Sequence, residues 1–71
     1  SERRQKMNQE KIGKFIAECR KKNNLTQMQL AEKLNITDRA VSKWESGLSK
    51  PSGENLISLA RIFNVHVESL F

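Results

Sequence analysis

The sequence predicts a compact all-α domain of five helices. Apolar residues recur at helical spacing, most clearly between Ile12 and Cys19, where they fall at i, i+3, i+4 and i+7. Residues that favour helix caps stand before the later apolar stretches, and Asn or Gly stands after them. No stretch shows the strict alternation of a half-buried strand. Together these observations favour short helices joined by short connections.

The first two predicted helices are delimited by local signals. The first runs from about residue 8 to residue 22, and the Asn23–Asn24 pair ends it because Asn tolerates the left-handed conformation. The second begins after Thr26, which has the spacing of a capping box with Gln29. Asn35 is expected to end this short helix.

The third predicted helix has a polar stripe as its main feature. It is capped by Thr37 and extends to about residue 46, before Gly47. Val41 and Trp44 lie on its apolar side. The opposite side carries polar residues at i, i+3, i+4 and i+7, namely Arg39, Ser42, Lys43 and Ser46.

Two further helical segments are expected after a loop. Residues 49–53 have the Ser, Pro and Gly content of a loop. Ser52 can cap a fourth helix over residues 53–63, which Asn64 ends. Residues 67–71 are expected to form one last helical turn, the fifth helix of the bundle.

The charge balance indicates a polyanionic partner. The 71 residues include 13 basic and 8 acidic side chains, a net charge of +5. Nucleic acid is the first candidate for such a partner, and an anionic membrane surface is the second. Cys19 and His66 are too few for a zinc site, and no cofactor is expected. No apolar run is long enough for a transmembrane helix or a signal peptide, so a cytoplasmic protein is expected.

Residues 1–6 are set apart from the rest. They contain no apolar residue and precede Met7, which is a plausible natural start. We expect a basic tail or an expression remnant at 1–6 and one domain at 7–71, with a DNA-wrapping arm as the alternative for the tail. Without three basic and one acidic residue of this segment, the net charge falls from +5 to +3.

Residues 27–46 have the layout of a helix-turn-helix motif. Two short helices must cross steeply, and the crossing needs a small residue, for which Ala31 is suitable. The turn needs a residue that tolerates positive φ, which Asn35 does. Apolar contacts between the two helices are supplied by Leu30, Leu34, Ile36, Val41 and Trp44.

The motif resembles that of the phage-repressor-like, or Xre-type, helix-turn-helix family. The resemblance rests on a Leu-Thr-Gln opening, a Leu-Ala pair, a Ser-Lys-Trp-Glu block, Gly47 and a loop proline, and it covers about residues 12–71. This chain departs from the family pattern at Asn35, where glycine is commoner, and at Cys19, where leucine is usual. The resemblance implies a non-catalytic five-helix domain of a bacterial or phage transcriptional regulator. Such domains bind operator DNA, usually as two-fold dimers.

The DNA contacts are predicted from the docking geometry of this motif. The second helix lies in the major groove with its N-terminal residues at base edges. There Arg39 can pair with guanine, and Lys43 with guanine or a phosphate. Asp38 can accept from a cytosine amino group or exclude misplaced phosphates, and Ala40 can contact a thymine methyl group. The start of the first motif helix favours a phosphate, and by resemblance Gln27 lies there and also braces a base. The full predicted set is Thr26, Gln27, Thr37, Asp38, Arg39, Ala40, Ser42, Lys43, Ser46 and Lys50.

The polar stripe, and several residues outside the predicted contact set, also have structural interpretations. The polar stripe can be a solvated helix face, which the helix-turn-helix context disfavours. Trp44 is expected in the core rather than stacked on a base, and Cys19 is expected to be a buried thiol rather than a redox sensor. His66 falls where a cap to the last turn would lie, with a pH switch as the alternative. By resemblance, Arg20 and Glu45 are expected to pair with each other, in a structural role rather than in DNA contact.

Three other functions are alternatives to DNA binding by a homodimer. A protein-interaction module, such as the DNA-binding half of an antitoxin, would need an apolar surface, for which Leu70–Phe71 is the one indication. This alternative includes a further domain, or a partner protein, beyond the C-terminus. A helical enzyme lacks a catalytic cluster in this sequence. An RNA-binding protein would need exposed aromatic residues, and those of this chain are assigned to the core or the terminus.

Overall fold

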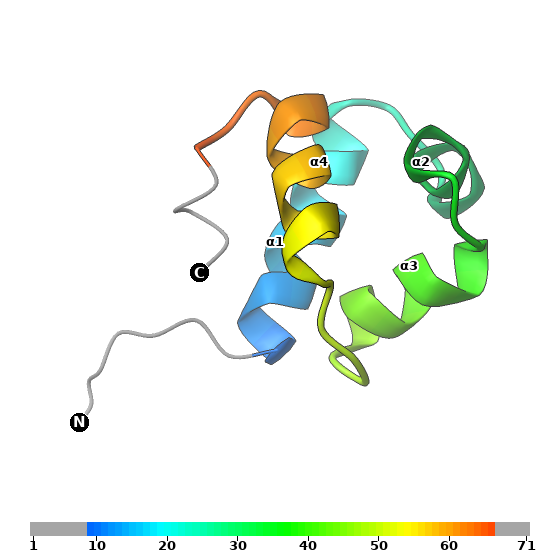
Figure 1. Cartoon of the computed structure of the whole chain (residues 1–71), viewed down its shortest axis with the longest axis vertical. Coiled ribbons are helices and arrows are strands. Elements are labelled where there is room, and N and C mark those ends of the chain that lie inside the picture. Colours follow the sequence, from blue (N-terminus) through cyan, green and yellow to red (C-terminus); the bar gives the residue numbers. More distant parts are fainter. Residues whose placement is uncertain (1–8, 67–71) are drawn as a thin grey trace.

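The computed structural model describes residues 9–66, which form four helices joined by short loops (Figure 1). The helices are α1 (Gln9–Lys22), α2 (Gln27–Leu34), α3 (Asp38–Ser46) and α4 (Gly53–Phe63). The described part of the chain contains no strand, so the all-α prediction is confirmed. The count of five helices is not confirmed, because the expected last turn at 67–71 lies outside the described residues, as does the tail at 1–6.

The predicted capping box begins α2. The Thr26 side-chain oxygen accepts a hydrogen bond from the Gln29 backbone N–H at 3.0 Å, and the Thr26 N–H donates to Gln29 Oε1 at 2.9 Å. Asn35 ends the helix with φ 59°, in the left-handed conformation that Asn tolerates. Asn24 has the same φ of 59° after α1, so both Asn assignments are confirmed.

The caps of α3 and α4 also follow the sequence. Thr37 Oγ1 accepts from the Ala40 backbone N–H, and Ser52 Oγ accepts from the Asn55 N–H, both at 3.3 Å. Each of these bonds satisfies a backbone donor that the first turn of a helix leaves unpaired. Gly47 ends α3 with φ 83°, a conformation that glycine adopts without strain.

The hydrophobic core gathers the inward sides of all four helices. Ile16, Leu30, Val41 and Leu59 are completely buried at its centre. Cys19 is buried with them, and this burial raises the pKa of its thiol, as expected for an unreactive core cysteine. The rest of the core cluster consists of Ile12, Ala31, Trp44, Leu56, Ala60 and Phe63.

Helix α1 passes very close to the end of α3 at Gly13. A Cβ atom at Gly13 would lie 2.1 Å from the Trp44 carbonyl oxygen and 3.0 Å from the Glu45 carbonyl oxygen. Only a residue without a side chain permits this approach. One helical turn before Gly13 in α1, Gln9 Nε2 donates to the Gly47 carbonyl oxygen at 3.1 Å. The first half of α1 therefore sets the position of the C-terminal end of α3.

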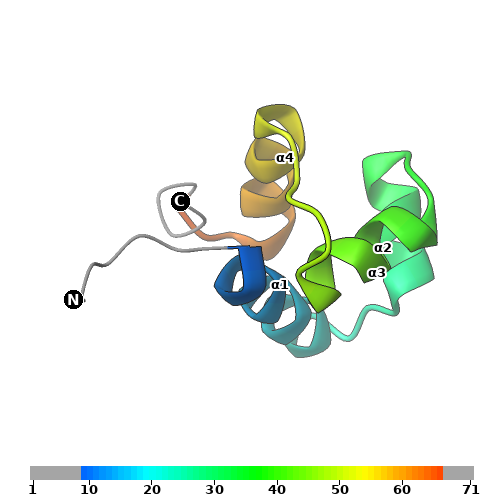
Figure 2. The ribbon, with the colours of Figure 1, turned by 90° about the horizontal axis from the view of Figure 1, so that it is seen from below.

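The two helices of the motif lie together on one side of the molecule. Figures 1 and 2 show α2 and α3 next to each other, on the side away from the described end of the chain after α4. None of the described helices is long and apolar enough to cross a membrane.

Candidate nucleic-acid interface

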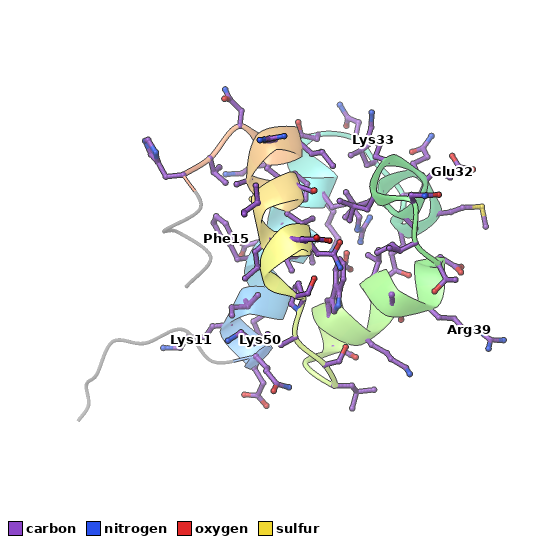
Figure 3. All side chains as sticks on the ribbon, viewed as in Figure 1. Lys11, Phe15, Glu32, Lys33, Arg39 and Lys50 are labelled. Carbon is purple, nitrogen blue, oxygen red and sulfur yellow. The ribbon has the colours of Figure 1, made fainter. Side chains whose placement is uncertain are left out.

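The orientation of α3 is fixed by its two buried residues. Val41 is 0% exposed and Trp44 is 5% exposed, so this side of the helix faces the core. Trp44 is therefore a core residue, as predicted. Arg39, Ser42 and Lys43 are exposed on the outer side. Figure 3 shows the Arg39 side chain extending away from the body of the molecule.

The first turn of α3 offers both polar and apolar groups. Asp38 is its first residue and is exposed, and Ala40 is half-buried. The Thr37 hydroxyl oxygen is used as the helix cap, but its proton remains available as a donor. All three predicted positions therefore lie at the end of the helix that can reach base edges first.

The last residue of the stripe, Ser46, and the loop residue Lys50 lie in different situations. Ser46 is exposed, and its hydroxyl donates to the Lys43 carbonyl at 3.1 Å. To donate to a phosphate instead, this hydroxyl must first give up that bond. Lys50 is exposed in the loop before α4, and Figure 3 shows it apart from Arg39.

The start of α2 has backbone features that favour an anion. The first backbone N–H groups of a helix have no partner within it, and the aligned peptide dipoles favour negative charge there. Thr26 is exposed at this end, and Gln27 is half-buried. The Gln27 side chain is not free, because its Nε2 donates to Glu45 Oε1 at 3.1 Å.

Arg20 and Glu45 form the ion pair that the resemblance implied. Arg20 Nε donates to Glu45 Oε2 at 2.6 Å, and Arg20 Nη2 donates to Glu45 Oε1 at 3.0 Å. The hydrogen bond to Glu45 raises the pKa of the Arg20 guanidinium above its ordinary value. Arg20 Nη1 also donates to the Leu25 carbonyl at 2.8 Å, which ties the loop between α1 and α2 to the pair.

The contact between Gln27 and Glu45 was not predicted from the sequence. The two residues are 18 positions apart and lie on different helices. Their contact depends on how α2 crosses α3, which helical periodicity does not specify. Sequence reasoning also passed over two exposed apolar residues beside the predicted contacts, Met28 (60% exposed) and Leu48 (76% exposed).

Comparison with known proteins places this motif among transcription regulators. The family model described as Helix-turn-helix matches residues 16–70. The HTH-type transcriptional activator BcrR of Enterococcus faecalis is 42% identical over 55 residues, which are 78% of this chain and 27% of that protein. The HTH-type transcriptional regulator DicA of Escherichia coli (strain K12) is 43% identical over 51 residues, which are 72% of this chain and 38% of that protein.

The fold agrees with a repressor structure solved on DNA. The P22 c2 repressor protein in complex with a synthetic operator has a TM-score of 0.79 and 30% identity, and the match covers 84% of this chain and 91% of that chain. This chain spans well under half the length of the two relatives named above. Its matched residues nevertheless include the whole motif. The chain belongs to the helix-turn-helix family, and its motif is of the phage-repressor-like, or Xre, type.

Proposed function

We propose that this chain is a sequence-specific, double-stranded DNA-binding domain of a transcription regulator, with α3 as the helix that enters the major groove. The observation that carries the proposal is the outer side of α3. Its polar residues are exposed, while Val41 and Trp44 anchor the opposite side in the core. A short, rigidly held helix with an exposed polar side is what the major groove can accept.

The relatives support regulation of transcription without indicating its direction. One is named an activator and another is a repressor of phage P22. A solved neighbour holds synthetic operator DNA. The proposal therefore covers operator binding and leaves the sign of regulation open.

The proposed contacts divide into base contacts and backbone contacts. Arg39 pairs with guanine, Asp38 accepts from cytosine and Ala40 contacts a thymine methyl group. Lys43 reaches a guanine or a phosphate. Backbone contacts come from hydroxyl, amide and ammonium groups around these, namely Thr26, Gln27, Thr37, Ser42, Ser46 and Lys50.

Two copies are proposed to bind one operator. Helix α3 has nine residues, so one copy reads only a few base pairs. Pairing increases both affinity and specificity, since a single module has a small interface with DNA. Two-fold related copies place their recognition helices about 34 Å apart, or a multiple of that, on one side of the duplex.

Selection from a pool of random duplexes tests this proposal. We expect the enriched sites to be inverted repeats, with half-site centres about 10 base pairs apart or a multiple of that. A chain carrying Arg39→Ala serves as the matched control and is expected to lose the preference at one position of each half-site. A pool that shows no enrichment after several rounds at low salt would contradict sequence-specific binding.

A further inference from the structure

The Glu45 carboxylate joins three segments of the chain at one point. It accepts two bonds from Arg20 of α1, at 2.6 Å and 3.0 Å, and one bond from Gln27 of α2, at 3.1 Å. Through Arg20 Nη1 the same cluster holds the Leu25 carbonyl in the loop before α2. The end of α3 is thus linked to the end of α1 and to the start of α2.

Glu45 and Arg20 are too enclosed to contact nucleic acid themselves. Their side chains are 10% and 13% exposed, respectively. Gln27 lies farther out, because it is half-buried and is the first residue of α2. Of these three side chains, the Gln27 amide is therefore the one that can meet DNA.

The charge of Glu45 determines which way the Gln27 amide turns. An ionised carboxylate has acceptors and no donor, so only the amide nitrogen of Gln27 can face it. That bond uses one N–H of the amide. The second N–H and the carbonyl oxygen remain available, and the carbonyl oxygen has no hydrogen-bond partner among residues 9–66. The side chain is thus oriented before any ligand arrives.

We infer that Glu45 is a positioning residue for DNA binding, which holds the Gln27 amide in one orientation at the start of α2 without contacting the DNA. The inference rests on the proposed function. Holding the amide in place removes part of the ordering cost that a free side chain would add to binding. The held donor also stands at the helix end whose unpaired backbone N–H groups attract a phosphate.

This role and simple electrostatics predict opposite effects for the same substitution. Glu45→Gln removes a negative charge, so charge alone predicts tighter binding to the DNA polyanion. If Glu45 positions Gln27, the substitution instead weakens binding, because a neutral amide no longer selects one orientation of its neighbour. The direction of the change separates the two explanations.

The test is a double-mutant cycle measured as the dissociation constant for a selected duplex. The variants are Glu45→Gln, Gln27→Ala and their combination, with Glu32→Gln as the matched control. Glu32 is an exposed acid on α2, and its substitution changes the charge by the same amount (Figure 3). Circular dichroism at the binding temperature establishes that each variant is folded.

We expect Glu45→Gln to bind about three- to tenfold more weakly than the unmodified chain. Glu32→Gln should bind equally or more tightly. In the Gln27→Ala background, Glu45→Gln should no longer weaken binding. The inference is overturned if Glu45→Gln binds as tightly as the unmodified chain, or if its loss is the same with and without Gln27. The latter result would assign Glu45 a structural role only.

A second variant covers a failure of Glu45→Gln to fold. Glu45→Asp keeps the charge and withdraws the carboxylate by one methylene group. The inference is supported if Glu45→Asp weakens DNA binding in the unmodified chain but not in the Gln27→Ala background. It is overturned if Glu45→Asp leaves DNA binding unchanged. Failure of the proposed function itself would look different, because the unmodified chain would then bind no duplex.

Discussion

Gly13 is the residue whose role depends most directly on the absence of a side chain. At an exposed position inside a helix, Gly→Ala stabilises the folded protein by about 1 kcal/mol, because alanine has the higher helix propensity. At Gly13 the added methyl group would meet the Trp44 carbonyl oxygen at 2.1 Å, and backbone on both sides cannot yield cheaply. The contact therefore reverses the usual sign of this substitution.

We expect Gly13→Ala to lower the free energy of unfolding by at least the about 1–3 kcal/mol typical of overpacking. Gly53→Ala is the matched control, because nothing lies within 4 Å of a Cβ there. Urea unfolding followed by circular dichroism measures both. Equal stability of the two variants would mean that α1 does not approach α3 this closely.

Substitutions at Arg39 and Lys50 distinguish contacts to base edges from contacts to the DNA backbone. We expect Arg39→Ala to cost about 1–3 kcal/mol of binding free energy and to relax the preference at one base pair. Lys50→Ala should weaken binding to all sequences almost equally and make the log–log salt slope shallower by about one. Binding-site profiles and salt titrations of the two variants provide the measurement. Profiles that change in the same way would contradict this division of contacts.

Prediction from sequence succeeded at residues whose role depends on near neighbours. The spacing of Val41 and Trp44 predicts their inward position, and the tolerance of Asn for positive φ predicts Asn35 in the turn; the structure confirms both. Gly13 and the Gln27–Glu45 bond were missed, since both depend on how different helices cross, which helical periodicity does not specify. The phosphate contact of Lys50 stays a prediction, because a position in a loop does not specify where its side chain lies.

At the scale of the helices, the ends were predicted well because caps are local chemistry. The helix starts after Thr26, Thr37 and Ser52 follow from side-chain oxygens that accept backbone N–H groups. The expected last turn at 67–71 stays a prediction, as it lies outside the described residues. The DNA contacts likewise stay predictions, since they depend on a partner molecule.

Ala31 tests how closely the motif helices pack. It is 2% exposed, and its carbonyl accepts from the Ile36 N–H at 3.0 Å in the turn. We expect Ala31→Leu to destabilise the domain by about 1–3 kcal/mol, because the larger side chain has no room beside the turn. Thermal melts of this variant and of Glu32→Leu check the expectation. Glu32 is exposed on the same helix, so its substitution should stay within about 0.5 kcal/mol.

An unchanged melting temperature for Ala31→Leu would show that the two helices are not packed tightly at this point. A large loss for Glu32→Leu would show that leucine disturbs α2 wherever it is placed. Either result would contradict the assignment of Ala31 as the small residue at the crossing.

At the scale of the whole molecule, the fold and the charge point to the same kind of partner. The chain carries a net charge of +5, and α3 is held with its polar side outward. Binding to DNA by such a domain releases counterions from the phosphates, so affinity falls as salt rises. Binding by two copies would involve more phosphates and give a steeper fall than binding by one.

The salt dependence of duplex binding tests the central claim most directly. Fluorescence anisotropy titrations with a selected duplex and a scrambled duplex, between about 50 and 200 mM salt, give both affinity and slope. For two copies that meet about 6–10 phosphates, we expect a log–log slope of roughly −5 to −9. The selected duplex should bind at least about a thousandfold more tightly than the scrambled one. A flat salt response, or equal affinity for the two duplexes, would contradict sequence-specific DNA binding by this domain.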